Sequence, residues 1–505
     1  MGKAMTAVIT PGKRGVWLPL VVAAVLFALS AGALASTDAQ ALHVLNRLAF
    51  GPAPGDVQRV ASMGVDQYIQ QQLHPDSMPL PDELQQQLAA LDTLRLSPTQ
   101  LFEQYGPQPH ARGEKSTPAE RKALRQHAKV ILQQATEARL LRAIDSPCQL
   151  QEVMTAFWFN HFNVFAGKGL DYLWIGSYEE TAIRPYALGH FRDLLFATAK
   201  SPAMLFYLDN WLDTQPGTPH AKGRFQGINE NYAREIMELH TLGVNGGYTQ
   251  TDVTTLAHIL TGWGLCPPHG FFSTPGGFCF DPQRHDFSSQ IFLGSSIAGG
   301  GQQETQQALE MLADSPVTAR HLSYELAQYF VADDPPASLV ERLTHTWMQS
   351  DGDIAAVLDT LFHSPEFWSA HYTGNKFKTP YEYVISMVRA TGEPVTNVQP
   401  LLGMMARLGM PLYGYLTPDG YKNTQDVWLN PDAMMMRLSF ATFVGSGNAR
   451  LDPSGADPQD PQTRASQLFD TLPGLFTPAQ IATIDSQPLP LRVGLILGSP
   501  QFQYR

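Results

Sequence analysis

The stretch NENYAREIMELH, residues 229–240, places three glutamates, two asparagines, one arginine and one histidine within fewer than four helical turns. On an α-helix, Asn231, Glu235 and Glu238 share one face. Two carboxylates one turn apart can bind a hard cation, or can separate their pKa values and act as proton donor and acceptor. The spacing therefore predicts a candidate site for a divalent cation or for acid–base catalysis at Glu235 and Glu238.

The same residues also fit a structural role. Arg234 lies four residues before Glu238, a spacing that favours an ion pair on a helix, and backbone amides can complete a satisfied buried network. Such networks contain the same residue types as active sites, so both interpretations stay open here. The residues assigned to a polar binding or structural network are Asn160, Asn229, Glu230, Asn231, Arg234, His240 and Asp286.

Two further segments offer polar side chains that can meet these carboxylates. The stretch FWFNHFNVF, residues 157–165, sets His161 among asparagines and five aromatic residues. The stretch RHDF, residues 284–287, sets His285 on a loop. A satisfied core histidine is the alternative explanation for His161. An enzyme hypothesis assigns catalytic roles to Glu235, Glu238, His161 and His285.

Sequence motifs that identify a metal or a nucleophile are missing. His240 follows Glu238 by two residues, whereas di-iron bundles use Glu-x-x-His and zinc proteases use His-Glu-x-x-His. No G-x-S-x-G motif occurs, which argues against a conventional acyl-transfer hydrolase. A divalent cation is therefore a hypothesis, and the metal stays unidentified.

Helices must position these residues. Asn229 is a predicted N-cap, Gly243 marks the end of that helix, and Thr249 with Asp252 forms a capping box for the next one. Alternating strand patterns are few. We predict a mainly α fold, a large multi-helix globular body with long loops and few or no strands. Helical periodicity recurs in residues 80–94, 118–145, 148–165, 230–263, 303–331, 337–363, 380–391 and 432–444.

The N-terminus has the pattern of a secretory signal peptide. Lys3, Lys13 and Arg14 precede an apolar run, and the small residues 33–35 form a cleavage site before Ser36. We therefore predict a periplasmic or extracellular protein. The alternative is an uncleaved anchor, because residues 15–35 are just long enough to span a bilayer.

The mature chain divides into blocks by composition. The glycine-rich stretch GSSIAGGGQQ, residues 294–303, is interpreted as a linker. The predicted organisation is a signal peptide at 1–35, an N-terminal helical region at 36–146, a central helical block at 147–294 and a C-terminal helical block at 303–505, with 36–505 forming one family domain.

Charge argues against a nucleic-acid partner. The chain carries 34 Lys and Arg against 46 Asp and Glu, a formal net charge of −12, which repels a phosphate backbone. The basic-rich run at 112–142 is interpreted as the solvated side of an amphipathic helix.

Cysteine usage fits an exported protein. Cys266 and Cys279 flank a loop rich in Pro and Gly, and a disulfide between them would contribute about 3 kcal/mol by the chain-entropy estimate. A metal site is the alternative, for which two cysteines are an incomplete ligand set. Cys148 is then left single and is expected to be buried.

Seven segments in order from about residue 41 to the C-terminus resemble the bacterial DUF1800 family, a domain of unknown function. They are HVLNRLAFGP, FWFNHFNVF, RPYALGHFRDLLFATAKSPAMLFYLDN, NENYAREIMELHTLGVNGGYTQTDV, LTGW, RHDF and SPQFQYR. The resemblance implies a mainly helical, often exported protein encoded beside members of DUF1501, which resemble sulfatases or phosphatases. It implies a DUF1501 partner, and because the family has no established activity, the resemblance assigns no catalytic role to any residue.

Three functional hypotheses remain. The first is an exported helical protein that acts with a partner protein in secretion, envelope or extracellular polymer processes. The second is an extracytoplasmic, hydrolase-like enzyme that uses Glu235 and Glu238, with or without a divalent metal. The third is a carbohydrate- or peptide-binding surface built from Tyr413, Tyr415, Tyr421 and Trp428.

Overall fold

The computed structural model describes residues 37–107, 117–266, 274–452 and 461–505. The predicted signal peptide, residues 1–35, lies outside the described residues. Within them, no helix has both the length and the apolar character needed to cross a membrane.

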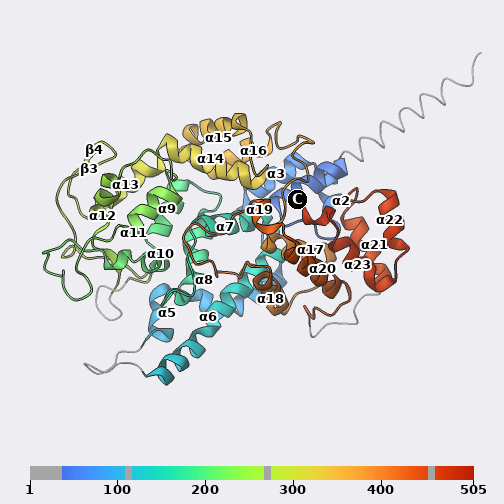
Figure 1. The fold of residues 1–505 in the computed structure, drawn as a ribbon, viewed down its shortest axis with the longest axis horizontal. Helices are drawn as coiled ribbons and strands as arrows, with labels where there is room; N and C mark the ends of the chain where they lie inside the picture. The colour runs from blue at the N-terminus through green and yellow to red at the C-terminus, as the bar shows by residue number, and fades with distance from the viewer. Residues whose placement is uncertain (1–36, 108–116, 267–273, 453–460) are drawn as a thin grey trace, which may run out of the picture.

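The described residues form a mainly α-helical body with two small antiparallel strand pairs (Figure 1). The fold-class prediction is confirmed. The N-terminal half contains a helix over residues 37–48, then α2 Asp56–Met63, α3 Val65–Leu73, α4 Asp82–Ala89, α5 Pro98–Tyr105, α6 Pro118–Asp145, α7 Gln149–His161, α8 Ile175–Tyr178, α9 Phe191–Ala199, α10 Pro202–Tyr207, α11 Glu230–Glu235 and α12 Gln250–Leu260.

The C-terminal half is also helical. Its helices are α13 Gln302–Ala313, α14 Pro316–Phe330, α15 Ala337–Gln349, α16 Ile354–Phe362, α17 Pro380–Thr391, α18 Gln399–Arg407, α19 Gln425–Trp428, α20 Pro431–Gly445, α21 Pro461–Thr471, α22 Pro478–Asp485 and α23 Leu489–Leu497. Short 3₁₀ turns are η1 Pro75–Ser77, η2 Asp92–Arg95, η3 Asp171–Leu173, η5 Arg184–Tyr186, η6 Asn210–Leu212 and η8 Gln501–Gln503, and two turns are π-helical, η4 Glu179–Ile183 and η7 Ile236–His240.

The four strands form two hairpins next to α12. Strand β1 Trp263–Leu265 pairs with β2 Phe278–Phe280, and β3 Gln290–Phe292 pairs with β4 Ser295–Ile297. The predicted disulfide between Cys266 and Cys279 is present and links the first strand pair covalently. Strand β4 occupies part of the glycine-rich stretch interpreted as a linker, because Leu293 and Gly294 both adopt positive φ angles and form a tight turn.

Several local predictions are confirmed in detail. Helices α6 and α17 coincide with the predicted segments 118–145 and 380–391. The capping box of Thr249 and Asp252 is present, and Cys148 is free and buried. The starts of these helices are predictable because a capping box depends only on residues three positions apart in the sequence.

The interpretation of the basic run as entirely solvated is wrong. The first turns of α6 are exposed, but the Arg139 side chain is buried. On α6, Arg139 lies next to the apolar face. The sequence gives no sign of the buried carboxylate that pairs with it.

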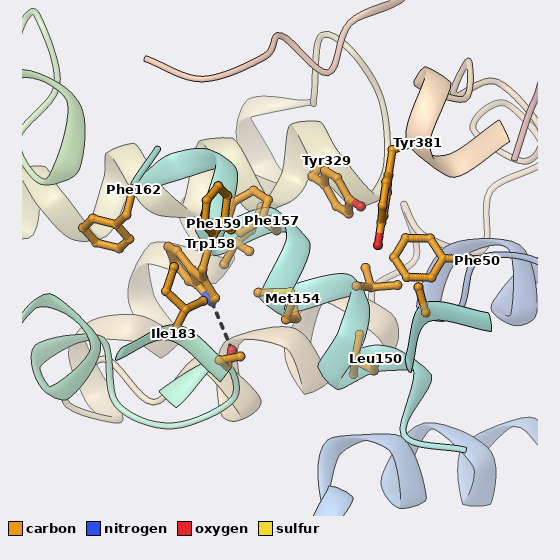
Figure 2. Close-up of a cluster of buried hydrophobic side chains, with 14 of the residues drawn as sticks. Phe50, Leu150, Met154, Phe157, Trp158, Phe159, Phe162, Ile183, Tyr329 and Tyr381 are labelled. Carbon is orange, nitrogen blue, oxygen red and sulfur yellow. Dashed lines mark hydrogen bonds between the residues drawn. The ribbon is translucent and has the colours of Figure 1, made fainter. Parts of the chain in front are cut away.

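Helix α7 is the central helix of the core. It is apolar on nearly every side, as expected for a helix enclosed by other elements. Figure 2 shows Phe157, Trp158 and Phe159 meeting residues of other segments, including Ile183 and Tyr329. The indole Nε1 of fully buried Trp158 donates to the carbonyl of Ala187 at 3.0 Å.

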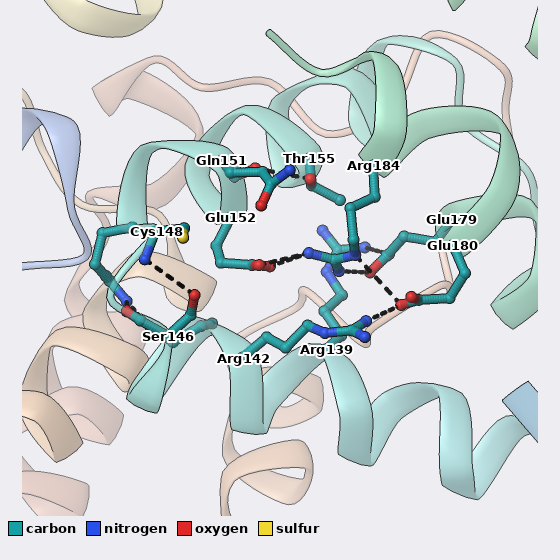
Figure 3. Close-up of polar contacts among 12 residues, drawn as sticks. Arg139, Arg142, Ser146, Cys148, Gln151, Glu152, Thr155, Glu179, Glu180 and Arg184 are labelled. Atoms are coloured by element: carbon teal, nitrogen blue, oxygen red, sulfur yellow. Dashed lines mark hydrogen bonds and ion pairs between the residues drawn. The ribbon is translucent and has the colours of Figure 1, made fainter. Parts of the chain in front are cut away.

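Three arginines and three glutamates form an ion network at the junction of α6, α7 and η4 (Figure 3). Arg184 of η5 pairs with Glu152 of α7 and, at 3.1 Å, with Glu179 of η4. Arg139 of α6 pairs with Glu179 at 2.9 Å. These four side chains are at most 10% exposed. Arg142 and Glu180 complete the set at its edge.

We expect Arg184→Met to lower the free energy of unfolding by about 3–5 kcal/mol, because it leaves Glu152 and Glu179 buried without their shared cation. Denaturant unfolding monitored by circular dichroism measures the change. Arg192→Met is the matched control: Arg192 pairs with the exposed residues Asp314 and Asp351, so its loss should cost less than about 1 kcal/mol. Equal losses for both variants would contradict this assignment.

Candidate functional site

The segment that carries the candidate carboxylates changes helix type within its length. Asn229 caps α11 by accepting a hydrogen bond from the Asn231 amide. After Glu235 the chain widens into the π-helical turn η7, and Gly243 follows with φ +84°. A π turn shifts the side chains that follow it relative to an α-helix, and such turns occur frequently at functional sites.

A cavity of about 290 Å³ lies between α7, η7, α14, α17 and the loop that connects α18 to α19. The structure brings together in its wall Asn160, His161 and Glu238, three of the residues singled out in the sequence. Residues that the sequence did not single out complete the wall. Its additional charged residues are Arg139, His321, Glu325, Glu382, Asp419 and Lys422.

Glu238 lies in the wall of this cavity, and Glu235, which is not a lining residue, interacts electrostatically with the lining residues Glu238 and Asp419. Both glutamates are half-buried, and among the described residues the Glu235 carboxyl makes no hydrogen bond or ion pair. Burial and the nearby charge of Glu238, supported by Asp419, raise the pKa of Glu235 to about 7, against the opposing effect of Arg234. A carboxyl with this pKa carries a proton for about half the time at neutral pH, as a general acid requires.

Arg234 does not link the two carboxylates as the structural interpretation proposed. Its guanidinium pairs with Glu230 at 3.1 Å. Glu230 also accepts hydrogen bonds from Gln250 and Thr254 of α12, each at 2.7 Å. Arg234 and Glu230 thus join α11 to α12, and Glu235 keeps its unpaired carboxyl.

Asn229 and Asn231 attach α11 to the end of α10. The side-chain amide of Asn229 donates to the carbonyl of Asp209 at 2.9 Å, and that of Asn231 donates to the carbonyl of Leu208 at 3.2 Å. The backbone amide of Asn229 donates to buried Asp213 at 2.7 Å. These contacts fix the helix that presents Glu235.

His161 is held on both sides. Its Nδ1 lies 2.8 Å from the Glu325 carboxylate, and its Nε2 lies 3.3 Å from the carbonyl of His240. His321 approaches the same carboxylate at 3.5 Å and bonds the carbonyl of Thr241 at 2.7 Å. The two imidazoles therefore connect α7 and α14 to the end of η7. Since an acceptor faces each ring nitrogen of His161, the ring anchors η7 with both nitrogens already in contact with protein oxygens.

His240 itself is buried in the core. Burial, followed by the charge of His161, lowers its pKa well below the ordinary value. It therefore stays neutral at physiological pH and packs against Phe162, with ring centroids 4.9 Å apart.

Asn160 and Asn163 hold the loop between α18 and α19 over the cavity. The side chain of Asn160 donates to the carbonyl of Tyr421 and accepts from its amide, at 2.8 and 2.7 Å. Asn163 donates to the carbonyl of Thr417 at 2.8 Å. Gly420 has φ +65°, and a Cβ there would meet the Asn160 carbonyl at 2.1 Å. This contact requires glycine.

The aromatic residues of the same loop are largely structural. Tyr413 is 3% exposed and donates to Glu179 of the ion network at 3.0 Å. Trp428 is 6% exposed and donates to the carbonyl of Lys422. The rings of Tyr415 and Tyr421 contact each other at 4.4 Å. They leave little aromatic surface for a ligand.

His285 and Asp286 lie outside the wall of the cavity. The imidazole of His285 is fully buried and contacts Glu304 of α13 and the carbonyl of Thr261. Asp286 pairs with His258 of α12 at 2.7 Å. The RHDF segment therefore joins α12 to α13, and the structure does not bring His285 to Glu235.

The donor geometry does not support a metal site. In the part of the chain that the structure describes, no group of three or more His, Cys, Asp or Glu side chains is arranged to hold a metal ion.

Sequence reasoning missed Glu325 and His321. Their i, i+4 spacing on α14 was the only local signal, and it is common on ordinary helices.

A family model described as a protein of unknown function, DUF1800, matches residues 43–504. The chain belongs to the DUF1800 family. The match includes the cavity, the ion network and both hairpins. Comparison with curated proteins and with solved structures found no match. The description of the DUF1800 family names no activity, so the function must be argued from the cavity.

The raised pKa of Glu235 predicts a pH dependence of stability. The folded protein retains a proton that the unfolded chain releases between pH 4.5 and about 7, so stability should fall as pH rises through this window. Glu235→Gln removes this loss and should become more stable relative to the parent as pH rises. Urea unfolding at both ends of the window measures it.

Glu230→Gln is the control of opposite sign. Hydrogen bonds from Thr254 and Gln250 lower the pKa of Glu230, so this variant should lose stability relative to the parent as pH rises from acid up to the usual range of the carboxyl, and should run parallel to the parent above it. If Glu235→Gln and the parent have parallel pH curves, Glu235 does not hold the proton.

Proposed function

We propose that the protein is an extracytoplasmic, hydrolase-like enzyme that uses Glu235 and Glu238 as an acid–base pair at the cavity. The single observation that carries the proposal is the unpaired, half-buried Glu235, which has a pKa of about 7 and lies one turn from Glu238 in the cavity wall. Two carboxylates with separated pKa values are the usual means of distinguishing acid from base.

The pair fits hydrolysis of a glycosidic bond. Glu235 donates its proton to the leaving oxygen as the bond between that oxygen and the anomeric carbon breaks. Glu238 accepts a proton from the water whose oxygen forms the new bond to that carbon. Protons and electrons balance in this scheme, and each carboxyl changes protonation state once.

The cavity wall suits a sugar unit. The buried aromatic residues Phe157, Phe159 and Tyr329 make part of the wall apolar, and Gln328 and Asn423 add amide groups. Small-molecule sites combine such apolar walls with a few polar groups. His161 acts as a positioning residue in this scheme, because its Nε2 contacts the His240 carbonyl at the end of η7 while Glu325 of α14 holds its Nδ1.

We expect Glu235→Gln and Glu238→Gln each to lower turnover by roughly 10²- to 10⁴-fold, the usual contribution of general acid–base catalysis. Release of reducing ends from a panel of 4-nitrophenyl glycosides and bacterial polysaccharides measures it. Parent activity should fall as pH rises through about 7, because Glu235 loses its proton. Arg342→Gln, on distant α15, should match the parent. Full turnover by both carboxylate variants would exclude the mechanism.

Export is part of the proposal. It is supported by the disulfide between Cys266 and Cys279, since disulfides persist in oxidising compartments. The basic and apolar N-terminal pattern adds sequence support.

A partner protein is a second candidate function, and an exposed apolar surface favours it. Helix α20 buries one side against α23, where a Cβ on Gly445 would lie 2.8 Å from the Gly494 amide nitrogen. Its other side, which we term the α20 patch, exposes Met435, Met436, Leu438 and Phe443, by 66% for Met435 and 41% for each of the others. Exposed Met-rich surfaces commonly bind other proteins. We propose a DUF1501-family protein as the partner, in secretion, envelope or polymer processes.

We expect Met435→Glu combined with Phe443→Glu to abolish co-purification with a co-expressed DUF1501-family protein, because a buried unpaired charge is costly at an interface. Met348→Glu is the matched control, since Met348 is 45% exposed on α15 and lies outside the patch. If the parent is repeatedly recovered alone, the partner proposal fails.

A further inference from the structure

A second cavity of about 1220 Å³ lies between α5, α10, the β1–β2 hairpin and the loop that precedes α11. It shares no lining residue with the cavity at Glu238. Helices α5, α8 and α10 lie in the same region of the fold in Figure 1. The disulfide contributes to its wall through Cys266 and Cys279. We call it the aromatic groove.

Five aromatic rings from separate segments contact one another in sequence at the groove, with Trp174 buried and the other four half-buried. Successive ring centroids are 6.2 Å apart for Phe102 and Trp174, 5.8 Å for Trp174 and Phe206, 5.4 Å for Phe206 and Trp211, and 6.1 Å for Trp211 and Phe225. All five residues line the cavity. Phe206 and Trp211 are nearly parallel, with 16° between their planes.

Cationic side chains lie at one end of this row. The guanidinium of Arg224 lies 4.4 Å from the ring centroid of Trp211, and Lys222 also lines the groove. Both residues are exposed, and neither forms an ion pair with another described residue. Arg284 is different, because it is buried and pairs with Asp281 at 3.4 Å.

We propose that the aromatic groove binds an acidic glycan. The apolar faces of successive sugar rings would stack on the aromatic row, since aromatic side chains provide rigid apolar surface. Carboxylates of the glycan would pair with Arg224 and Lys222, whose positive charges are uncompensated. This inference goes beyond the proposed enzymatic function and does not depend on it, because the residues differ.

The charge pattern favours a glycan over single-stranded nucleic acid. Single-stranded nucleic acid also stacks on aromatic platforms, but it needs a positively charged groove along the backbone. Here two unpaired cations sit at one end of a five-ring row, in a chain with net charge −12. An occupant with more apolar ring surface than charge fits this pattern better.

Isothermal titration calorimetry with the full chain tests the proposal. The probes are an oligogalacturonate, a neutral cello-oligosaccharide and oligo(dT) of similar length. We expect oligogalacturonate to bind at least tenfold more tightly than either other probe. Arg224→Gln should weaken that binding and reduce its salt dependence, and Trp211→Ala should weaken it roughly tenfold or more. Arg342→Gln, an exposed arginine on α15, should leave it unchanged.

Several outcomes would overturn the inference. They are equal binding of the neutral oligosaccharide, tighter binding of oligo(dT), no binding of any probe, or unchanged oligogalacturonate binding in both groove variants. Trp211 is half-buried, so circular dichroism must show that Trp211→Ala is folded. Arg224→Gln carries the test alone if it is not, because its side chain is exposed.

Discussion

The buried ion network at the junction of α6, α7 and η4 is the constraint on which the site depends. Charges removed from water must be paired, because one unpaired partner costs several kcal/mol. Arg184 satisfies this requirement by contacting Glu152 and Glu179 at once, which fixes the π-helical turn η4 against α7. Arg139 extends the network to the cavity wall, and Tyr413 connects it to the loop above.

Two π-helical turns each contribute one carboxylate. The turn η4 contributes Glu179 to the ion network, and η7 contributes Glu238 to the cavity. A π turn contains an extra residue compared with an α turn, so it displaces side chains from the regular helical stripe. In η7 the displacement is held by His161 and His321, which bond the carbonyls at its end. The packing of the core and the hydrogen bonds of these two imidazoles therefore both act on the residues at the end of η7.

The two cavities differ in the charge of the residues that line them. The cavity at Glu238 is lined by the carboxylates of Glu238, Glu325, Glu382 and Asp419, with Arg139 and Lys422 among its cations. The aromatic groove combines ring surface with unpaired cations. An acid–base site benefits from neighbouring carboxylates that raise a pKa, whereas the carboxylate that lines the aromatic groove, that of Asp281, is paired with His220 at 2.8 Å and with Arg284 at 3.4 Å. Because the walls of the two cavities differ in charge, one chain can hold both kinds of site.

Spacing along the chain predicted most of the helices, their caps and the disulfide, because each depends on residues within a few positions or one loop of each other. The same spacing singled out Glu235, Glu238, His161 and Asn160, but it predicted the wrong carboxylate partner for Arg234 and grouped His285 with them. Which polar residues meet depends on how the helices pack. Pairs such as His161 with Glu325, or Arg139 with Glu179, join segments far apart in the chain, and their identity depends on helix packing that no local pattern encodes.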